Sequence, residues 1–124
     1  MAGSFPKDTG FGQASECQCW NSGANYQQFD RPRLVGVDTT EGRFADVTLE
    51  ECRTCGDLWL GYQVEYEAFS KSGRWARRQI CKADANEITP ETALQYIEAD
   101  QYAYGGTYFD GKTGWRSGHM HWGL

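Results

Sequence analysis

The sequence lacks a hydrophobic run long enough to cross a bilayer, and it lacks an excess of positive charge. A membrane-spanning helix needs roughly 20 apolar residues, so we expect no insertion into a membrane. The N-terminal stretch MAGSFPKDTGFGQAS has neither the basic start nor the apolar centre of a secretion signal, which predicts a cytoplasmic protein. The net charge of −5 argues against general affinity for the phosphate backbone of a nucleic acid.

Common catalytic motifs are also missing. The sequence contains no nucleophile elbow, no phosphate-binding loop, no dinucleotide-binding fingerprint and no metalloprotease helix. An enzyme normally leaves a cluster of nucleophile, base and anion-holding residues, and no such cluster is visible. We therefore predict that the protein is not an enzyme and has no catalytic residues.

Length and composition bound the fold. A chain of 124 residues with ordinary charged and apolar fractions, no internal repeat and no sign of a second domain predicts one globular unit. We expect residues 1–15, which are polar and glycine-rich, to form a loosely ordered N-terminal segment, and residues 16–124 to form the single domain. Fifteen glycines and eighteen aromatic residues favour strands joined by tight turns.

The strand patterns favour antiparallel hairpins. Two short apolar runs, 33–37 and 43–49, flank a loop rich in Asp, Thr and Gly, which is typical of a hairpin. Residues 58–69 (LWLGYQVEYEAF) alternate apolar and polar side chains, as an amphipathic strand does. A turn at 70–73 would then lead into a returning strand over 74–81.

One helix completes the predicted architecture. Residues 89–101 (TPETALQYIEADQ) begin with Thr89 as a helix N-cap and Pro90 at the first helical position, and an apolar stripe follows. Residues 107–110 suit a short strand. We therefore expect an α+β fold, mostly antiparallel sheet with one packed helix.

Four of the five cysteines form two close pairs, Cys17 with Cys19 and Cys52 with Cys55. In a reducing compartment such pairs are more often metal ligands or redox groups than disulfides. A structural zinc site needs four ligands, and two short pairs require only one loop to be closed. The sequence therefore predicts a zinc site with these four ligands. Cys81 is left over, and we interpret it as a small buried hydrophobic residue.

The downstream pair resembles the knuckle of zinc-ribbon proteins, C-x-x-C-G. Cys52, Cys55 and Gly56 match this pattern residue by residue, the glycine allowing the backbone to turn under the metal. The upstream sequence CQC departs from it, with one intervening residue instead of two. In an extended strand Cys17 and Cys19 would still share a face. The resemblance implies a zinc-ribbon-like site of four cysteines with zinc as the cofactor.

Other interpretations of these motifs remain open. A C-x-x-C pair also serves thiol oxidoreductases, in which the motif starts a helix in a βαβ unit. Here a strand pattern follows the motif, and Gly56 would weaken a helix start. His119 and His121 form an H-x-H sequence that could supply reserve metal ligands, although we interpret both as solvated or packed on aromatic residues.

Four thiolates fill the coordination sphere of a zinc ion, so such a site organises a fold and cannot activate water. We therefore expect a non-catalytic protein-interaction module. Its general profile is similar to bacterial immunity and antitoxin proteins, which implies a basic toxin or nuclease as partner. The carboxylates expected to steer such a partner are Glu50, Glu51, Glu87, Glu91, Glu98 and Asp100. The alternative is a zinc-ribbon adaptor that binds nucleic acid through the basic segment 74–78.

Overall fold

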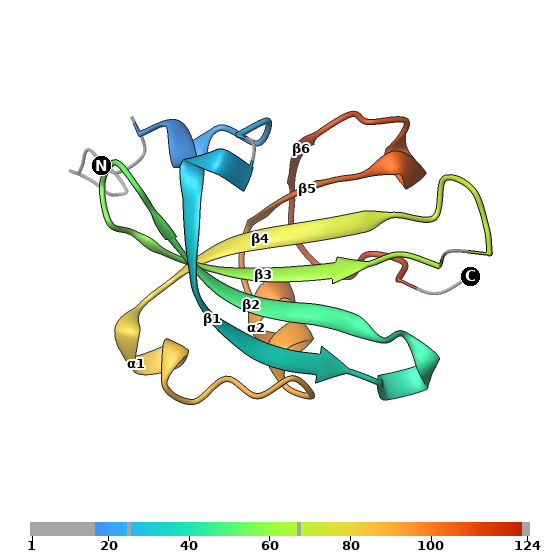
Figure 1. Ribbon diagram of the computed structural model, residues 1–124, viewed down its shortest axis with the longest axis horizontal. Helices are drawn as coiled ribbons and strands as arrows, with labels where there is room; N and C mark the ends of the chain where they lie inside the picture. The colour runs from blue at the N-terminus through green and yellow to red at the C-terminus, as the bar shows by residue number, and fades with distance from the viewer. Residues whose placement is uncertain (1–16, 25, 67, 123–124) are drawn as a thin grey trace.

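The structure is a computed structural model that describes residues 17–24, 26–66 and 68–122. The predicted loose segment 1–15 therefore lies outside the described residues. Six strands form one antiparallel sheet in the order β1-β2-β3-β4-β5-β6, so each strand pairs with its neighbour along the chain (Figure 1). The strands are β1 Phe29–Asp38, β2 Ala45–Cys52, β3 Leu58–Val64, β4 Arg74–Ile80, β5 Tyr102–Gly105 and β6 Gly114–Arg116.

Two short α-helices and several single helical turns precede or connect the strands. They are α1 Lys82–Ala85, α2 Ala93–Glu98 and the 3-10 turns η2 Gln18–Trp20, η3 Tyr26–Gln28, η4 Thr40–Gly42 and η5 Thr107–Phe109. The prediction of an α+β fold dominated by antiparallel sheet is confirmed. Within the described part of the chain, no helix is long and apolar enough to span a membrane.

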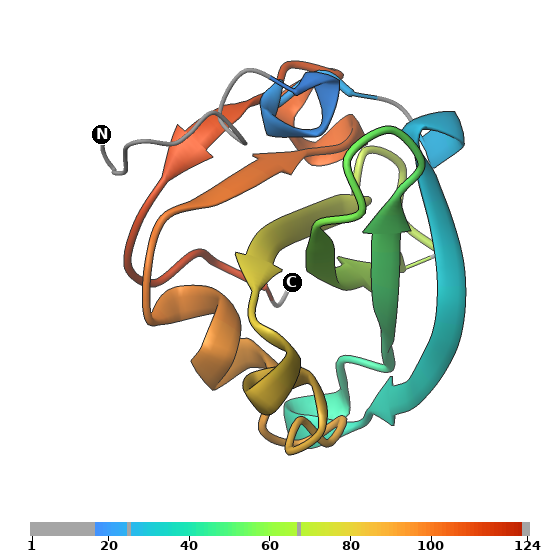
Figure 2. The ribbon, with the colours of Figure 1, turned by 90° about the vertical axis from the view of Figure 1, so that its left-hand side faces the viewer.

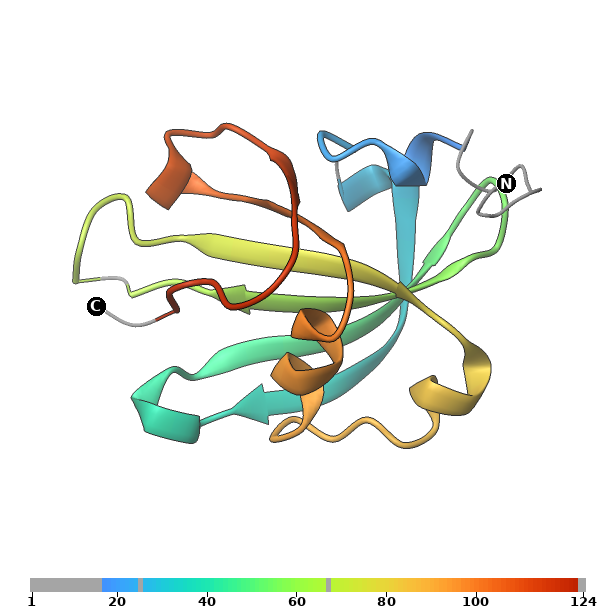
Figure 3. The same cartoon turned by 180° about the vertical axis from the view of Figure 1, so that it is seen from behind.

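One face of the sheet, here called the helix face, packs against α2 (Figure 3). The alternation in β2 and β3 places one set of apolar side chains on this face, where Val47 and Leu60 are fully buried. Ala93 and Ile97 of α2 are also fully buried and close the core from the other side. The C-terminal segment adds Trp122 to the same cluster.

The opposite face, here called the second face, carries a row of aligned residues that crosses five strands. Thr48 pairs with Gly61, Gly61 with Arg77, Arg77 with Ala103, and Ala103 with Trp115. Directly opposed residues of an antiparallel pair project from the same side, so these five share one face. The sheet is strongly curved, and the N-terminal turn η2 lies beside the β5–β6 hairpin at this face (Figure 2).

The β3–β4 hairpin has a longer loop than predicted. Val64 pairs with Arg74, so nine residues, 65–73, connect the strands instead of a turn at 70–73. Ser72 explains the early end of the ladder. Its hydroxyl accepts a hydrogen bond from the backbone N–H of Tyr66 at 2.9 Å and donates one to the carbonyl of Tyr66 at 2.9 Å. The serine side chain therefore replaces the backbone partner that a further strand residue would have supplied.

Three local predictions were wrong in detail. The helix predicted over 89–101 is shorter, because residues 89–92 form turns in which the Thr89 hydroxyl accepts from the N–H of Thr92 at 3.3 Å. Residues 107–110, predicted as a strand, begin with the 3-10 turn η5. Cys81 is exposed, since it lies at the N-cap of α1, a helix that the sequence pattern did not indicate.

Candidate metal centre

Four cysteine side chains converge at one end of the second face. The sulfur atoms of Cys17, Cys19, Cys52 and Cys55 all lie within 4.8 Å of one another. The shortest separations are 3.5 Å between the Sγ atoms of Cys17 and Cys52 and 3.6 Å between those of Cys19 and Cys55. Each short contact joins one cysteine of the upstream pair to one of the downstream pair. The predicted convergence of the two pairs is therefore confirmed.

The spacing of these sulfurs suits a single tetrahedral cation. Zinc–sulfur bonds of about 2.3 Å place the corners of a tetrahedron about 3.8 Å apart. The observed separations of 3.5 and 3.6 Å and the outer limit of 4.8 Å bracket that value. All four cysteines are free thiols, so the cluster is not a pair of disulfides. The donor set therefore fits a metal that prefers four sulfur ligands.

The downstream half of the cluster has the geometry of a knuckle. Cys52 ends β2, and the backbone turns so that the N–H of Gly56 donates to the carbonyl of Cys52 at 3.0 Å. Gly56 adopts a positive φ of 82°, a conformation that glycine reaches without strain. The N–H of Thr54 and the side-chain amide of Gln28 donate to the Cys52 sulfur at 3.4 and 3.3 Å. The backbone therefore turns at Gly56 as the C-x-x-C-G pattern predicted.

The upstream half differs from the predicted extended strand. Cys17 has extended backbone angles, but the chain then enters the turn η2, in which the N–H of Trp20 donates to the carbonyl of Cys17 at 3.0 Å. The two thiols therefore approach the site from one helical turn. This geometry compensates for the single residue between Cys17 and Cys19, because the turn brings side chains together that an extended strand would space more widely.

Aromatic side chains fix the upstream turn in place. The indole of Trp20 lies edge-on to that of Trp59, with ring centroids 4.9 Å apart, and stacks on Trp115 at 5.9 Å. Its Nε1 also donates to the Asp57 carboxylate at 3.3 Å. Sequence reasoning missed these contacts. The one available signal was a tryptophan directly after CQC and another shortly after the knuckle, both typical of a small packed cluster.

The surroundings of Cys19, Cys52 and Cys55 give these three thiols different pKa values. Burial opposes ionisation of Cys52, but the backbone N–H of Cys55 and the side chain of Gln28 outweigh it and lower the pKa of this thiol to about 6. Burial raises the pKa of Cys55 to about 12, and it also raises the pKa of Cys19. Without a cation these shifts favour a thiolate at Cys52 and protonated thiols at Cys19 and Cys55. A bound divalent cation would favour ionisation of all four.

The two histidines do not join this centre. His119 Nδ1 lies 3.0 Å from the Glu98 carboxylate on α2, and His121 is exposed. Within residues 17–24, 26–66 and 68–122, the four cysteines are the only group of three or more potential ligands that lie close enough to share an ion. The histidines are therefore not needed as reserve ligands.

The basic segment 74–78 does not present a cationic face. Arg74 is 2% exposed and lies over the ring of Tyr108 at 4.1 Å. Arg77 is 7% exposed. Arg78 donates to the backbone carbonyl of Tyr96 at 2.6 Å. Three arginines held in this way do not form the exposed row of cations that such binding uses.

No family model, no curated protein and no solved structure matches this chain. The function is therefore inferred from the chemistry of the site itself.

Proposed function

We propose that this protein is a non-catalytic zinc-binding module for protein interaction. One observation carries the metal-binding part: the four cysteine sulfurs lie within 4.8 Å of one another although they come from two segments more than thirty residues apart. Four thiolates leave no open coordination position, so the ion stabilises the fold and does not activate water or substrate. The sulfur set also suits iron, and zinc is proposed because the downstream half resembles a zinc-ribbon knuckle.

Native mass spectrometry combined with metal analysis tests this proposal. The purified protein should carry one zinc ion per chain, and the ion should be lost from the Cys52→Ser variant. Cys81→Ser is the matched control, because Cys81 is exposed and lies outside the cluster. This control should retain the zinc. A metal-free wild-type chain, or a variant at position 52 that keeps its zinc, would contradict the proposal.

The glycine of the knuckle offers a finer test. Alanine at position 56 would meet only the Glu51 carboxylate at 3.8 Å, so its cost is backbone strain of about 1–2 kcal/mol. Gly42→Ala is the control, since Gly42 has a similar φ of 75° with nothing near its Cβ position. Both variants should lose similar stability in urea denaturation of the metal-free protein. Only Gly56→Ala should also weaken zinc binding, by about tenfold, because it distorts the turn between two ligands. Equal zinc affinities would show that the turn does not organise the site.

The net charge of −5 supports the proposal that the partner is a basic protein, such as a nuclease toxin held by an immunity-type inhibitor. Four of the six carboxylates expected to steer such a partner are exposed. They are Glu51, Glu87, Glu91 and Asp100. Glu50 is instead buried, and Glu98 is engaged with His119 and the N–H of Met120. The exposed four are therefore the candidates for electrostatic steering.

This steering predicts a salt dependence. With a purified basic nuclease as the partner, association should slow as ionic strength rises, because charges separated by more than about 8 Å are screened at 0.15 M salt. A double variant, Glu87→Gln with Glu91→Gln, should reduce the on-rate at low salt while the off-rate changes little. Stopped-flow kinetics measure both rates. An on-rate that is independent of salt would count against an acidic docking surface.

A thiol oxidoreductase is the alternative that the C-x-x-C motif favours. Two features of the structure argue against it: Cys52 ends a strand instead of starting a helix, and the upstream pair lies within the same sulfur cluster. The two functions differ in a simple assay. Zinc bound by all four thiolates protects them from alkylation, whereas a redox pair reacts in the purified protein without prior chelation.

A further inference from the structure

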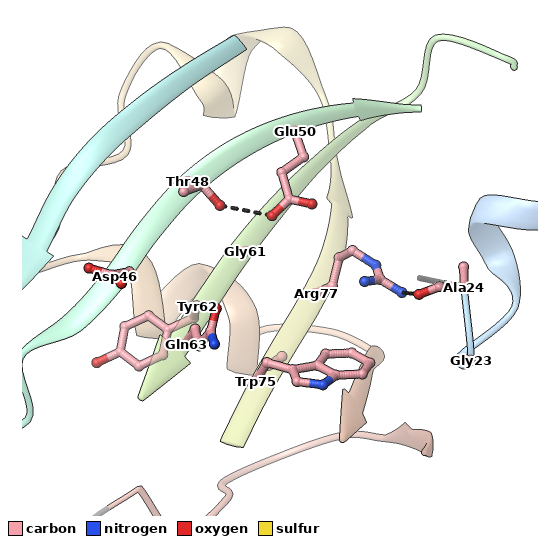
Figure 4. A pocket seen from close by; sticks show the side chains of 11 residues that line it. Gly23, Ala24, Asp46, Thr48, Glu50, Gly61, Tyr62, Gln63, Trp75 and Arg77 are labelled. Carbon is pink, nitrogen blue, oxygen red and sulfur yellow. Dashed lines mark hydrogen bonds between the residues drawn. The ribbon is translucent and has the colours of Figure 1, made fainter. Parts of the chain in front are cut away.

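A cleft on the second face lies next to the cysteine cluster. It has a volume of about 410 Å³, within the range typical of small-molecule sites. Its floor is Gly61 of β3, with Thr48 and Glu50 of β2 along one side and Trp75 and Arg77 of β4 along the other (Figure 4). The segment that follows the upstream cysteines closes one end through its residues 23 and 24.

The cationic side of the cleft is a buried arginine with an unfilled donor. Arg77 is 7% exposed, and its guanidinium lies over the rings of Phe29 at 4.4 Å and Trp75 at 4.9 Å. Its one hydrogen bond to the described residues is a long contact of 3.5 Å to the carbonyl of Ala24. Its buried Nε has no acceptor among them. Aromatic rings stabilise the charge but accept no such hydrogen bond in the plane of the guanidinium.

The anionic side of the cleft is a buried glutamate. Glu50 is 8% exposed and accepts a hydrogen bond from the Thr48 hydroxyl at 2.8 Å. The carboxylate lies over Gly61, because a Cβ at that position would approach its Oε2 to 2.5 Å. Gly61 therefore makes room for the charge, and any side chain there would displace it. Asp46, exposed at the mouth, adds a second carboxylate to the same side.

Arg77 and Glu50 carry opposite charges and both line the cleft, but they do not form an ion pair with each other. The charge of Glu50 acts on Arg77 electrostatically, yet the described residues contain no ion pair within 4.0 Å between them. Burying both charges unpaired is costly unless a further group satisfies them. A bound group that offers an acceptor to the guanidinium and a donor to the carboxylate would satisfy both charges. A molecule that carries both an anionic and a cationic end meets these two needs at once.

We propose that this cleft binds a small zwitterion of the amino-acid type. Its carboxylate accepts from the Arg77 guanidinium, and its ammonium group donates to Glu50, with Asp46 reinforcing the attraction. The missing side chain of Gly61 leaves room for the Glu50 carboxylate on the floor of the cleft. The proposal does not depend on which protein partner the module binds, and it can fail while the metal site stands.

Isothermal titration calorimetry with the zinc-loaded protein tests this proposal. The probes are the twenty amino acids, β-alanine and γ-aminobutyrate, with N-acetylglycine and glycinamide as ligands that carry one charge only. We expect at least one zwitterion to bind with one site per chain, and its single-charge analogues to bind at least about tenfold more weakly. Absence of binding by every zwitterion at about 10 mM would overturn the proposal.

Two variants locate the bound molecule. Glu50→Gln keeps the shape of the side chain and removes its charge, so it should weaken binding at least about tenfold. Glu65→Gln is the control, since Glu65 is exposed and does not line the cleft. The control should bind as the wild type does. Circular dichroism confirms that both variants fold, and unchanged affinity in folded Glu50→Gln would place the ligand elsewhere and overturn the proposal.

Discussion

Removing the metal from the purified protein is expected to lower its free energy of unfolding by about 4 kcal/mol. A ligand present at roughly a thousand times its dissociation constant stabilises the folded state by that amount, because it binds the folded chain and not the unfolded one. In this protein the ion would join two segments that are otherwise held by aromatic contacts and by the hydrogen bond from Trp20 to Asp57. Urea denaturation with and without a strong chelator measures the difference.

When the metal is removed, the loss of structure should begin at the second face of the sheet. Without the ion, the turn η2 loses its metal-mediated attachment to the loop after β2, while the core of the helix face keeps its packing. Trp20 and Trp115 then separate, and tryptophan fluorescence changes before the sheet unfolds. Hydrogen exchange should show the same order. Chelation that leaves stability, fluorescence and exchange unchanged would mean that the four thiols hold no structural ion. The Cys81→Ser variant should respond to chelation as the wild type does.

Replacing Asp38 by asparagine is expected to cost about 3 kcal/mol, at the lower end of the range for breaking a buried ion pair. The Asp38 carboxylate is fully buried at the end of β1 and accepts a hydrogen bond from the Tyr62 hydroxyl at 2.5 Å. Arg43 lies 3.3 Å from the same oxygen and is 12% exposed. The N–H of Thr40 donates to the other oxygen at 3.0 Å. Asparagine would leave Arg43 with only the exposed Glu41 carboxylate, 3.3 Å away, as its counter-charge.

Asp30→Asn is the matched control for this substitution. Asp30 lies on the same strand and forms an ion pair with Arg53 at 3.1 Å, but both side chains are about 60% exposed. Exposed ion pairs contribute at most about 1 kcal/mol, so the control should remain close to wild-type stability. Urea denaturation of the two variants gives the comparison. Similar losses in both would show that the buried network is not a main source of stability.

The lowered pKa of Asp38 predicts how the free energy of unfolding changes as the pH falls. Burial opposes ionisation of Asp38, but hydrogen bonds from Thr40, Tyr62 and Arg43 outweigh it and hold the pKa of this carboxyl below its usual value. The stabilisation is therefore present above the unfolded pKa of about 3.9 and is lost as pH falls through that value toward the folded pKa. Below about pH 4, Asp38→Asn should lose less stability than the wild type. Parallel pH profiles would contradict this assignment.

The fold could be predicted where local pattern and pairing partner lie close together in the chain. The alternation in β3 and the turn residues between β1 and β2 indicated antiparallel hairpins, and the structure confirms them. The cysteine spacing likewise predicted convergence, because each pair is short and only one loop has to close. These inferences needed no knowledge of distant contacts.

What could not be predicted depends on side chains from distant segments. The basic segment 74–78 suggested an alternative in which it binds nucleic acid, yet Arg74 lies over the ring of Tyr108 and Arg77 over that of Phe29, which come from distant parts of the chain. The CQC segment suggested a strand, but packing of Trp20 against Trp115 favours a turn. Periodicity describes which face a residue occupies. It does not show which partner lies against that face.

X-ray absorption spectroscopy at the zinc edge tests the central claim most directly. Four sulfur neighbours are expected at about 2.3 Å from one zinc ion in the wild-type protein and in Cys81→Ser, and no bound zinc is expected in Cys52→Ser. A first shell dominated by nitrogen or oxygen, or fewer than four sulfurs in the wild type, would contradict a centre built from residues 17, 19, 52 and 55.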